Sequence, residues 1–160
     1  MKVLRVLSGS AESTKKLGAE IGKRLSGGEV LLLKGPLGAG KTTLVQGIAA
    51  GLGIVGPVQS PSFVLERIHR GRLRLRHLDF YRLTAAEVED AGLIDDLSED
   101  DVAVIEWADR VSRVPGATLE IRLSFVPCSE ETREIVLECV DERWKQKVDD
   151  AIRESGVRYR

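Results

Sequence analysis

The chain has 160 residues, enough for one domain with a hydrophobic core and too few for two domains of ordinary size. With 42% hydrophobic residues, 31% charged residues and a net charge of −1, it is predicted to be globular, with no general electrostatic attraction to nucleic acid or membranes. No apolar stretch approaches the roughly 20 residues of a membrane-spanning helix, and Lys2 and Arg5 interrupt the first apolar run, which argues against a signal peptide.

The chain begins with a predicted strand over residues 3–7 and continues into a predicted helix. Leu17, Ile21 and Leu25 recur at every fourth position, so they share one face of that helix. Ser10 precedes this pattern and belongs to the residue types that cap helix N-termini. We therefore expect a strand and then an amphipathic helix before the next motif.

Residues 35–42 read Gly-Pro-Leu-Gly-Ala-Gly-Lys-Thr and fit the phosphate-loop pattern of Gly, four residues, Gly, Lys and Ser or Thr. The apolar run at 29–33 is typical of a buried parallel strand, and residues 43–52 carry the apolar period of a helix. Such a loop binds phosphates because its backbone N–H groups and the helix dipole face the anion. The motif predicts a nucleoside triphosphate site.

Each residue of the phosphate loop has an expected role. Lys41 would reach the β and γ phosphates, and the Thr42 hydroxyl would ligate Mg²⁺. Pro36 has no N–H group, so it is excluded as a phosphate donor. The predicted nucleotide-binding residues are Gly35, Leu37, Gly38, Ala39, Gly40, Lys41 and Thr42.

Residues 51–59 are rich in glycine and proline and predict a loop, which Ser60-Pro61-Ser62-Phe63 continues. Many nucleotide hydrolases have at this point a mobile loop whose hydroxyls sense the γ-phosphate and the metal. The same four residues also fit an ordinary turn. Ser60 and Ser62 are therefore candidates for a switch.

The next segment predicts a β-hairpin with arms over residues 64–68 and 72–78 and a turn at 69–71. In the second arm Arg72, Arg74 and Arg76, here called the arginine strip, alternate with apolar residues and share one face. The strip is interpreted either as the solvated outer face of an edge strand, where charge opposes aggregation, or as a docking surface for an acidic partner or nucleic-acid phosphates. His69 and His77 are interpreted as solvent-facing or structural.

Two carboxylates follow the phosphate loop and could serve the chemistry. Residues 102–105 predict a buried strand ending at Glu106-Trp107, and a carboxylate at the C-terminal end of a parallel strand lies on the ligand-binding edge of an open sheet. Phosphoryl transfer needs a carboxylate for Mg²⁺ or for the attacking water, and we favour Glu106 for this role. Asp79 either acts beside it or fixes a turn, and Trp107 is either a site residue or ordinary core.

The C-terminal part predicts an antiparallel pair, residues 119–125 and 133–140, and then a helix. Cys128 and Cys139 form neither a metal pattern nor a disulfide framework. Cys139 alternates with Ile135 and Leu137, so we expect it to be a reduced, buried thiol and the protein to be cytoplasmic. We expect an α/β protein: a single P-loop NTPase domain over residues 1–160. Its mixed, mostly parallel sheet would be flanked by helices, with the hairpin as an insertion and with C-terminal antiparallel strands plus a terminal helix.

Four segments occur in the order found in one known family. They are the phosphate loop extended to Thr43, residues 60–63, residues 77–83 (His-Leu-Asp-Phe-Tyr-Arg-Leu) and Glu106-Trp107. They cover nearly the whole chain, and Asp-Phe-Tyr-Arg-Leu followed by Glu-Trp is much more specific than the phosphate loop alone. The sequence resembles the TsaE family, the small bacterial ATPases of tRNA threonylcarbamoyladenosine modification.

The resemblance implies an ATPase that uses ATP and Mg²⁺ and acts with a TsaD-type transferase and its TsaB-type paralogue. It implies no membrane or DNA contact, and tRNA contact only indirectly or through the arginine strip. Many members have an acid at position 36 and threonine at position 62, where Ser62 keeps the hydroxyl. The implied site residues are Lys41, Asp79 and Glu106 for catalysis, Thr42 and Glu106 for the metal, Thr43 for nucleotide, and Ser60, Ser62 and Trp107 for switching or partner contact.

Two other functions fit the same phosphate loop. A small-molecule kinase usually brings an arginine-rich lid over a second substrate pocket, whereas the arginines here alternate along a hairpin. A regulatory nucleotide-binding subunit with incidental hydrolysis would use the same residues as an active ATPase. The timing of hydrolysis and the division of roles between Asp79 and Glu106 stay open at this point.

Overall fold

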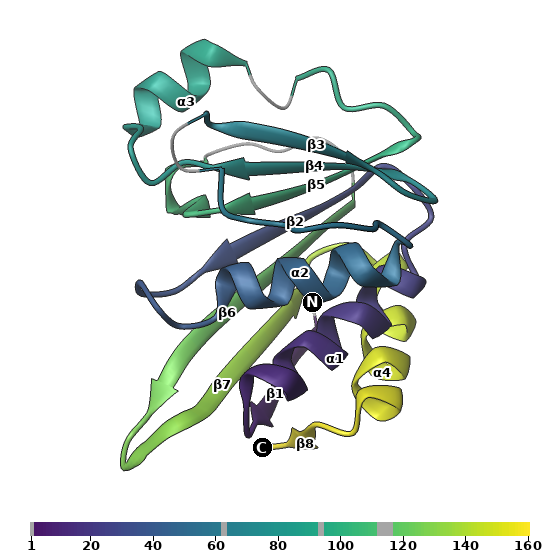
Figure 1. The fold of residues 1–160 in the computed structure, drawn as a ribbon, viewed down its shortest axis with the longest axis vertical. Helices are drawn as coiled ribbons and strands as arrows, with labels where there is room; N and C mark the ends of the chain where they lie inside the picture. The colour runs from purple at the N-terminus through teal and green to yellow at the C-terminus, as the bar shows by residue number, and fades with distance from the viewer. Residues whose placement is uncertain (1, 62–63, 93–94, 112–116) are drawn as a thin grey trace.

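The computed structural model describes residues 2–61, 64–92, 95–111 and 117–160 (Figure 1). Its helices are α1 (Ala11–Lys23), α2 (Lys41–Gly51), α3 (Ala85–Ala91), α4 (Arg143–Ser155) and the short 3-10 helix η1 (Ala108–Arg110). Its strands are β1 (Lys2–Ser8), β2 (Glu29–Lys34), β3 (Glu66–Arg70), β4 (Arg74–Asp79), β5 (Asp101–Glu106), β6 (Ala117–Val126), β7 (Ser129–Cys139) and β8 (Arg158–Tyr159).

These strands form one sheet in the order β3-β4-β5-β2-β6-β7-β1-β8. The central strands β4, β5, β2 and β6 are mutually parallel, while β3 on one side and β7, β1 and β8 on the other pair antiparallel. The α/β class, the mixed sheet, the hairpin and the C-terminal antiparallel strands with their helix are confirmed. Parallel strands make the centre of the sheet rather than most of it, because antiparallel strands extend both edges.

The two faces of the sheet have separate cores. Helices α1, α2 and α4 cover one face, as Figure 1 shows, and supply apolar side chains such as Leu17, Ile48 and Trp144. A smaller core on the other face contains Phe80 and Val88, the second of which comes from α3. Within the described residues, no helix is both long and apolar enough to cross a bilayer.

Local signals in the sequence explain several of the helix ends. The Ser10 hydroxyl accepts a hydrogen bond from the Ser13 amide at the start of α1. Thr84 and Glu87 form a complete capping box at the start of α3. Gly92, in the left-handed region at φ 57°, ends the same helix. Ser10 and Thr84 satisfy amide groups that the helices leave unpaired, whereas the Gly92 amide donates to the Glu89 carbonyl.

The turn of the hairpin lies at a different position from the predicted one. Its turn lies at residues 71–73 rather than 69–71, because β3 and β4 pair as far as Arg70 and Arg74. Gly71 packs against the end of α2, where a Cβ would lie 2.4 Å from the Leu52 carbonyl oxygen. The Arg72 amide donates to that same carbonyl at 2.8 Å. Tertiary contact with α2 therefore selects the turn.

The interpretation of the arginine strip as the solvated outer face of an edge strand is wrong. β4 is not an edge strand, since β5 pairs with its other side. Each guanidinium also has partners within the chain. Those partners are the Leu25 and Gly22 carbonyls for Arg72, the Asp101 carboxylate for Arg74, and the Glu66 and Asp96 carboxylates for Arg76. The strip therefore links the hairpin to α1, β3 and β5.

Candidate active site

The phosphate loop connects the C-terminal end of β2 to the start of α2. Gly35, Gly38 and Gly40 have φ angles of 148°, 81° and 107°, a region that residues with a Cβ rarely adopt. At Gly35 a Cβ would also lie 2.4 Å from the Leu123 carbonyl oxygen. The glycines are therefore required by the shape of the loop and by its close approach to β6.

The loop delivers the chain to the N-terminus of α2. Gly40 is the N-cap residue and has no side chain with which to satisfy the first amide groups of the helix. Lys41, Thr42 and Thr43 form the first turn, which contains no acidic residue. Unsatisfied amides and the positive end of the helix dipole make this end of α2 suited to an anion.

Lys41 is held inside the loop. Its side chain is 5% exposed, and its Nζ donates to the carbonyl oxygens of Gly35 at 2.6 Å and Pro36 at 3.0 Å. Burial lowers the pKa of the ammonium, while the nearby Glu106 and Asp79 carboxylates oppose that shift. The ammonium is thus positioned beside the helix N-terminus where phosphates are expected.

Glu106 lies at the C-terminal end of β5 with its carboxylate turned toward α2. The Thr42 hydroxyl donates to Oε1 at 3.0 Å and to Oε2 at 3.2 Å. The His77 Nε2 atom lies 2.6 Å from Oε2. The structure therefore brings together the two residues predicted to bind metal, and adds a histidine that the sequence reading left as solvent-facing or structural.

Asp79 lies beside Glu106, since the two are paired in register at the ends of β4 and β5. The Ser60 hydroxyl donates to Asp79 Oδ2, and the Tyr81 amide donates to Oδ1 at 2.9 Å. Asp79 is thus connected to the segment that was predicted to act as a switch. Ser62, the second switch candidate, lies outside the described residues.

Trp107 borders the site directly after Glu106. Its φ of 59° places it in the left-handed region, which turns the chain sharply at the end of β5. Lys41 Nζ lies 4.1 Å from the Trp107 ring centroid, and the Tyr81 ring lies 4.8 Å from it. A cation at this distance over an indole is attracted by the ring face. Trp107 therefore borders the cavity and also packs against the smaller core.

These groups surround one cavity of about 390 Å³. The sequence reading did not assign Tyr81 or Arg82 to the site. The Asp-Phe-Tyr-Arg-Leu segment that contains them was the signal that could have placed them there. The cavity is lined by Leu37, Gly38, Gly40, Lys41, Thr42, Thr43, Ser60, Asp79, Tyr81, Arg82, Glu106 and Trp107.

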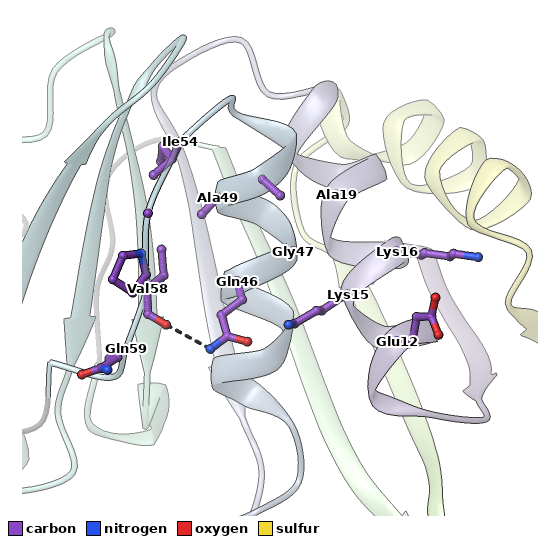
Figure 2. Close-up of a pocket in the computed structure, with 13 residues that line it drawn as sticks. Glu12, Lys15, Lys16, Ala19, Gln46, Gly47, Ala49, Ile54, Val58 and Gln59 are labelled. Atoms are coloured by element: carbon purple, nitrogen blue, oxygen red, sulfur yellow. Dashed lines mark hydrogen bonds between the residues drawn. The ribbon is translucent and has the colours of Figure 1, made fainter.

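A larger hollow of about 580 Å³ lies away from these groups, between α1, α2 and residues 54–59. Figure 2 shows Gln46 reaching from α2 toward that segment, where its Nε2 donates to the Val58 carbonyl at 3.0 Å. Aliphatic and backbone atoms make much of its wall, with Glu12, Lys15 and Lys16 on α1 beside them. The phosphate loop, Asp79 and Glu106 lie at the smaller cavity, which is therefore the candidate active site.

Comparison with known proteins decides the family. Residues 8–135 match the family described as "Threonylcarbamoyl adenosine biosynthesis protein TsaE". This chain belongs to the TsaE family. A TsaE from Treponema pallidum is 40% identical over 84% of this chain and 99% of its own, and one from Mycobacterium tuberculosis is 40% identical over 74% and 77%.

The fold of this chain is similar to that of a protein whose structure has been solved. Bacillus subtilis YdiB superposes with a TM-score of 0.77 at 29% sequence identity, covering 95% of both chains. The family match contains the phosphate loop, Asp79, Glu106 and Trp107. Membership in the TsaE family and its P-loop, ATP-binding character, predicted from the motifs, are confirmed.

Proposed function

We propose that this protein is a Mg²⁺-dependent ATPase of tRNA threonylcarbamoyladenosine modification that acts with TsaD-type and TsaB-type partners. The hydrogen bond between Thr42 and Glu106 carries the proposal. It joins the expected metal-binding hydroxyl of a phosphate loop to a strand-end carboxylate. The relatives named above are tRNA threonylcarbamoyladenosine biosynthesis proteins, which supports the same process for this chain.

The residues present fit Mg²⁺. Thr42 and Glu106 offer a hydroxyl and a carboxylate, and Mg²⁺ prefers oxygen ligands and completes its shell with phosphate and water. Mg²⁺, when bound, would neutralise negative charge that develops on the phosphoryl group. Thr42 and Glu106 are therefore the proposed metal ligands.

The remaining groups bind the nucleotide and position water. The backbone amides of the loop and of Thr43 would hold the phosphates, and Lys41 would exchange its two carbonyl partners for phosphate oxygens. Asp79, fixed by Ser60 and the Tyr81 amide, would orient the attacking water. The water oxygen then bonds to the γ-phosphorus and loses a proton, the bond to the bridging β–γ oxygen breaks, and ADP, phosphate and the proton are released.

The open side of the cavity supports a role for a partner. Leu37 is 77% exposed and Tyr81 is 50% exposed, although both line the cavity. Apolar side chains around an open site lose contact with water when another protein covers them. Covering would also exclude bulk water and strengthen the electrostatic interactions inside. We therefore propose slow hydrolysis by the isolated chain and faster hydrolysis in the complex.

The test is ATP turnover measured first with the chain alone, then with the TsaB–TsaD pair, and then with tRNA added. We expect tight nucleotide binding, slow turnover alone and strong stimulation by the pair. Fast hydrolysis that the pair does not change would contradict partner dependence. A phosphorylated small molecule, formed when candidate acceptors are supplied, would assign a kinase instead.

A further inference from the structure

His77 is the buried neighbour of the catalytic carboxylates. It lies on β4 two residues before Asp79, is 0% exposed, and contacts Glu106, which is itself 3% exposed. The parallel register pairs His77 with Val104 and Asp79 with Glu106. The imidazole therefore lies deeper in the protein than the two carboxylates, and His77 is not among the described residues that line the cavity.

The unpartnered nitrogen of the ring identifies the tautomer. Among the described residues His77 Nδ1 is buried without a hydrogen-bond partner, whereas Nε2 lies 2.6 Å from Glu106 Oε2. A proton on Nδ1 would leave a buried N–H unsatisfied and would point the Nε2 lone pair at a carboxylate oxygen, which costs free energy twice. A proton on Nε2 avoids both penalties and donates to Glu106.

This hydrogen bond sets the direction of the carboxylate. One oxygen, Oε2, is held by His77, while the other, Oε1, is the oxygen nearer to the Thr42 hydroxyl. Without His77, Glu106 would keep only the Thr42 contact among the side-chain hydrogen bonds described for it. A metal ligand whose orientation is not fixed binds its ion more weakly, because ordering it then costs entropy at each binding event.

We propose that His77 is a positioning residue: in its Nε2–H form it orients Glu106 so that carboxylate Oε1 and the Thr42 hydroxyl bind one divalent cation. This inference rests on the metal site of the proposed function. The histidine does not touch the cation or the nucleotide. It acts through Glu106, in the way that hydrogen-bond partners of metal ligands fix ligand orientation.

The test measures Mn²⁺ binding to the ADP complex by electron paramagnetic resonance, with ADP affinity measured separately in the absence of metal. His77→Leu removes the donor, and we expect Mn²⁺ affinity to fall about 10- to 100-fold while metal-free ADP affinity stays unchanged. His77→Gln retains an N–H donor and should recover much of the loss. His69→Leu is the matched control: among the described residues His69 Nε2 is also buried without a hydrogen-bond partner, and His69 lies on the neighbouring strand β3.

The outcomes separate this inference from the proposed function. Equal Mn²⁺ affinity in the wild type and in His77→Leu would overturn the positioning role and leave the metal site standing. Failure of the wild type to bind Mn²⁺ with ADP would overturn both. If His77→Leu does not fold, His77→Gln and the ¹⁵N shifts of His77 in the wild type decide: a proton on Nδ1 would overturn the proposal.

Discussion

Thr42 and Glu106 are 64 positions apart in the chain, yet their side chains share hydrogen bonds of 3.0 and 3.2 Å. Threonine and glutamate are both common residues, so residue type alone does not mark either one as part of a site. Their function arises from the place where α2 begins and β5 ends.

Lys41→Ala should lower ATP turnover by roughly 100-fold or more, because it removes a lysine that lines the cavity of the phosphate loop. The measurement is Mg·ATP hydrolysis together with a thermal melt, which should show that the fold is intact. Lys15→Ala is a matched control, since Lys15 lies on α1 at the larger hollow. Full turnover by Lys41→Ala would reject the assignment of this residue.

Glu106→Gln should reduce turnover by roughly 100-fold or more while ATP still binds, because the variant keeps the shape but removes the charge that would hold Mg²⁺. Asp79→Asn is the comparison, and turnover and the Mg²⁺ concentration for half-maximal rate should be measured for both. The Mg²⁺ concentration for half-maximal rate should rise, and it should rise more for Glu106→Gln than for Asp79→Asn. If only Asp79→Asn raises this Mg²⁺ concentration, the roles of the two carboxylates are reversed.

Trp107 should report nucleotide binding through its fluorescence. Lys41 lies 4.1 Å from the ring centroid, so its movement toward phosphates would change the environment of the indole. ATP and ADP should be titrated against the wild type and against Trp107→Phe, which retains the buried Trp144 as background. An equal signal in both proteins would show that Trp107 does not sense the nucleotide.

At the scale of elements, α1 and α2 pack with their backbones unusually close. A Cβ added at Gly47 would lie 2.2 Å from the Lys15 carbonyl oxygen, and one at Gly22 would lie 2.3 Å from the Ile48 carbonyl oxygen. Glycines on both helices therefore allow α1 to sit against the helix that carries the phosphate loop. This contact ties the position of α2 to the rest of the fold.

Gly47→Ala should destabilise the protein by about 1–3 kcal/mol, the usual cost of overpacking a well-filled interior. The clash involves backbone rather than a flexible side chain, so α1 and α2 must separate to relieve it. Gly9→Ala is the matched control, because nothing lies within 4 Å of a Cβ there. Chemical denaturation of both variants measures the difference, and equal stability would contradict the packing argument.

At the scale of the whole molecule, a charge cluster joins the hairpin to the start of β5. Asp101 is buried and accepts from Arg74 Nε at 2.5 Å and Nη2 at 2.9 Å, and from the Ser98 amide at 3.1 Å. The hydrogen bonds from Arg74 hold the pKa of Asp101 below its ordinary value of 3.8, although burial opposes this. The cluster therefore stabilises the fold only while this carboxylate is ionised.

Asp101→Asn should lower the melting temperature at pH 7 by several degrees, because it removes the charge that faces two arginines. A depressed folded-state pKa gives stability that is complete above the unfolded pKa of about 4 and is lost as pH falls through the folded value. The difference between variant and wild type should therefore shrink below about pH 4. Melting curves from pH 7 to pH 2 test this, and a constant difference would exclude the charge as its cause.

The amino-acid sequence by itself determined the strand, glycine loop and helix around Lys41, because these depend on neighbours in the chain and on local backbone rules. Likewise, the helix start after Ser10 and the apolar runs of β2 and β5 were predicted from local pattern. The hairpin itself was also predicted, although its turn lies two residues later than expected. Local signals thus determined the elements and most of the site.

Only the tertiary structure decided how distant residues meet. His77 was read as solvent-facing or structural, because nothing in its neighbourhood of the sequence shows that Glu106 lies 2.6 Å away. The arginine strip was interpreted as an exposed surface, because alternation identifies a face but not what packs against it. The hairpin turn lies two residues later than predicted, because Gly71 packs against the end of α2. Strand order and the partners of buried charges depend on contacts between residues far apart in the sequence, and local sequence pattern does not show these contacts.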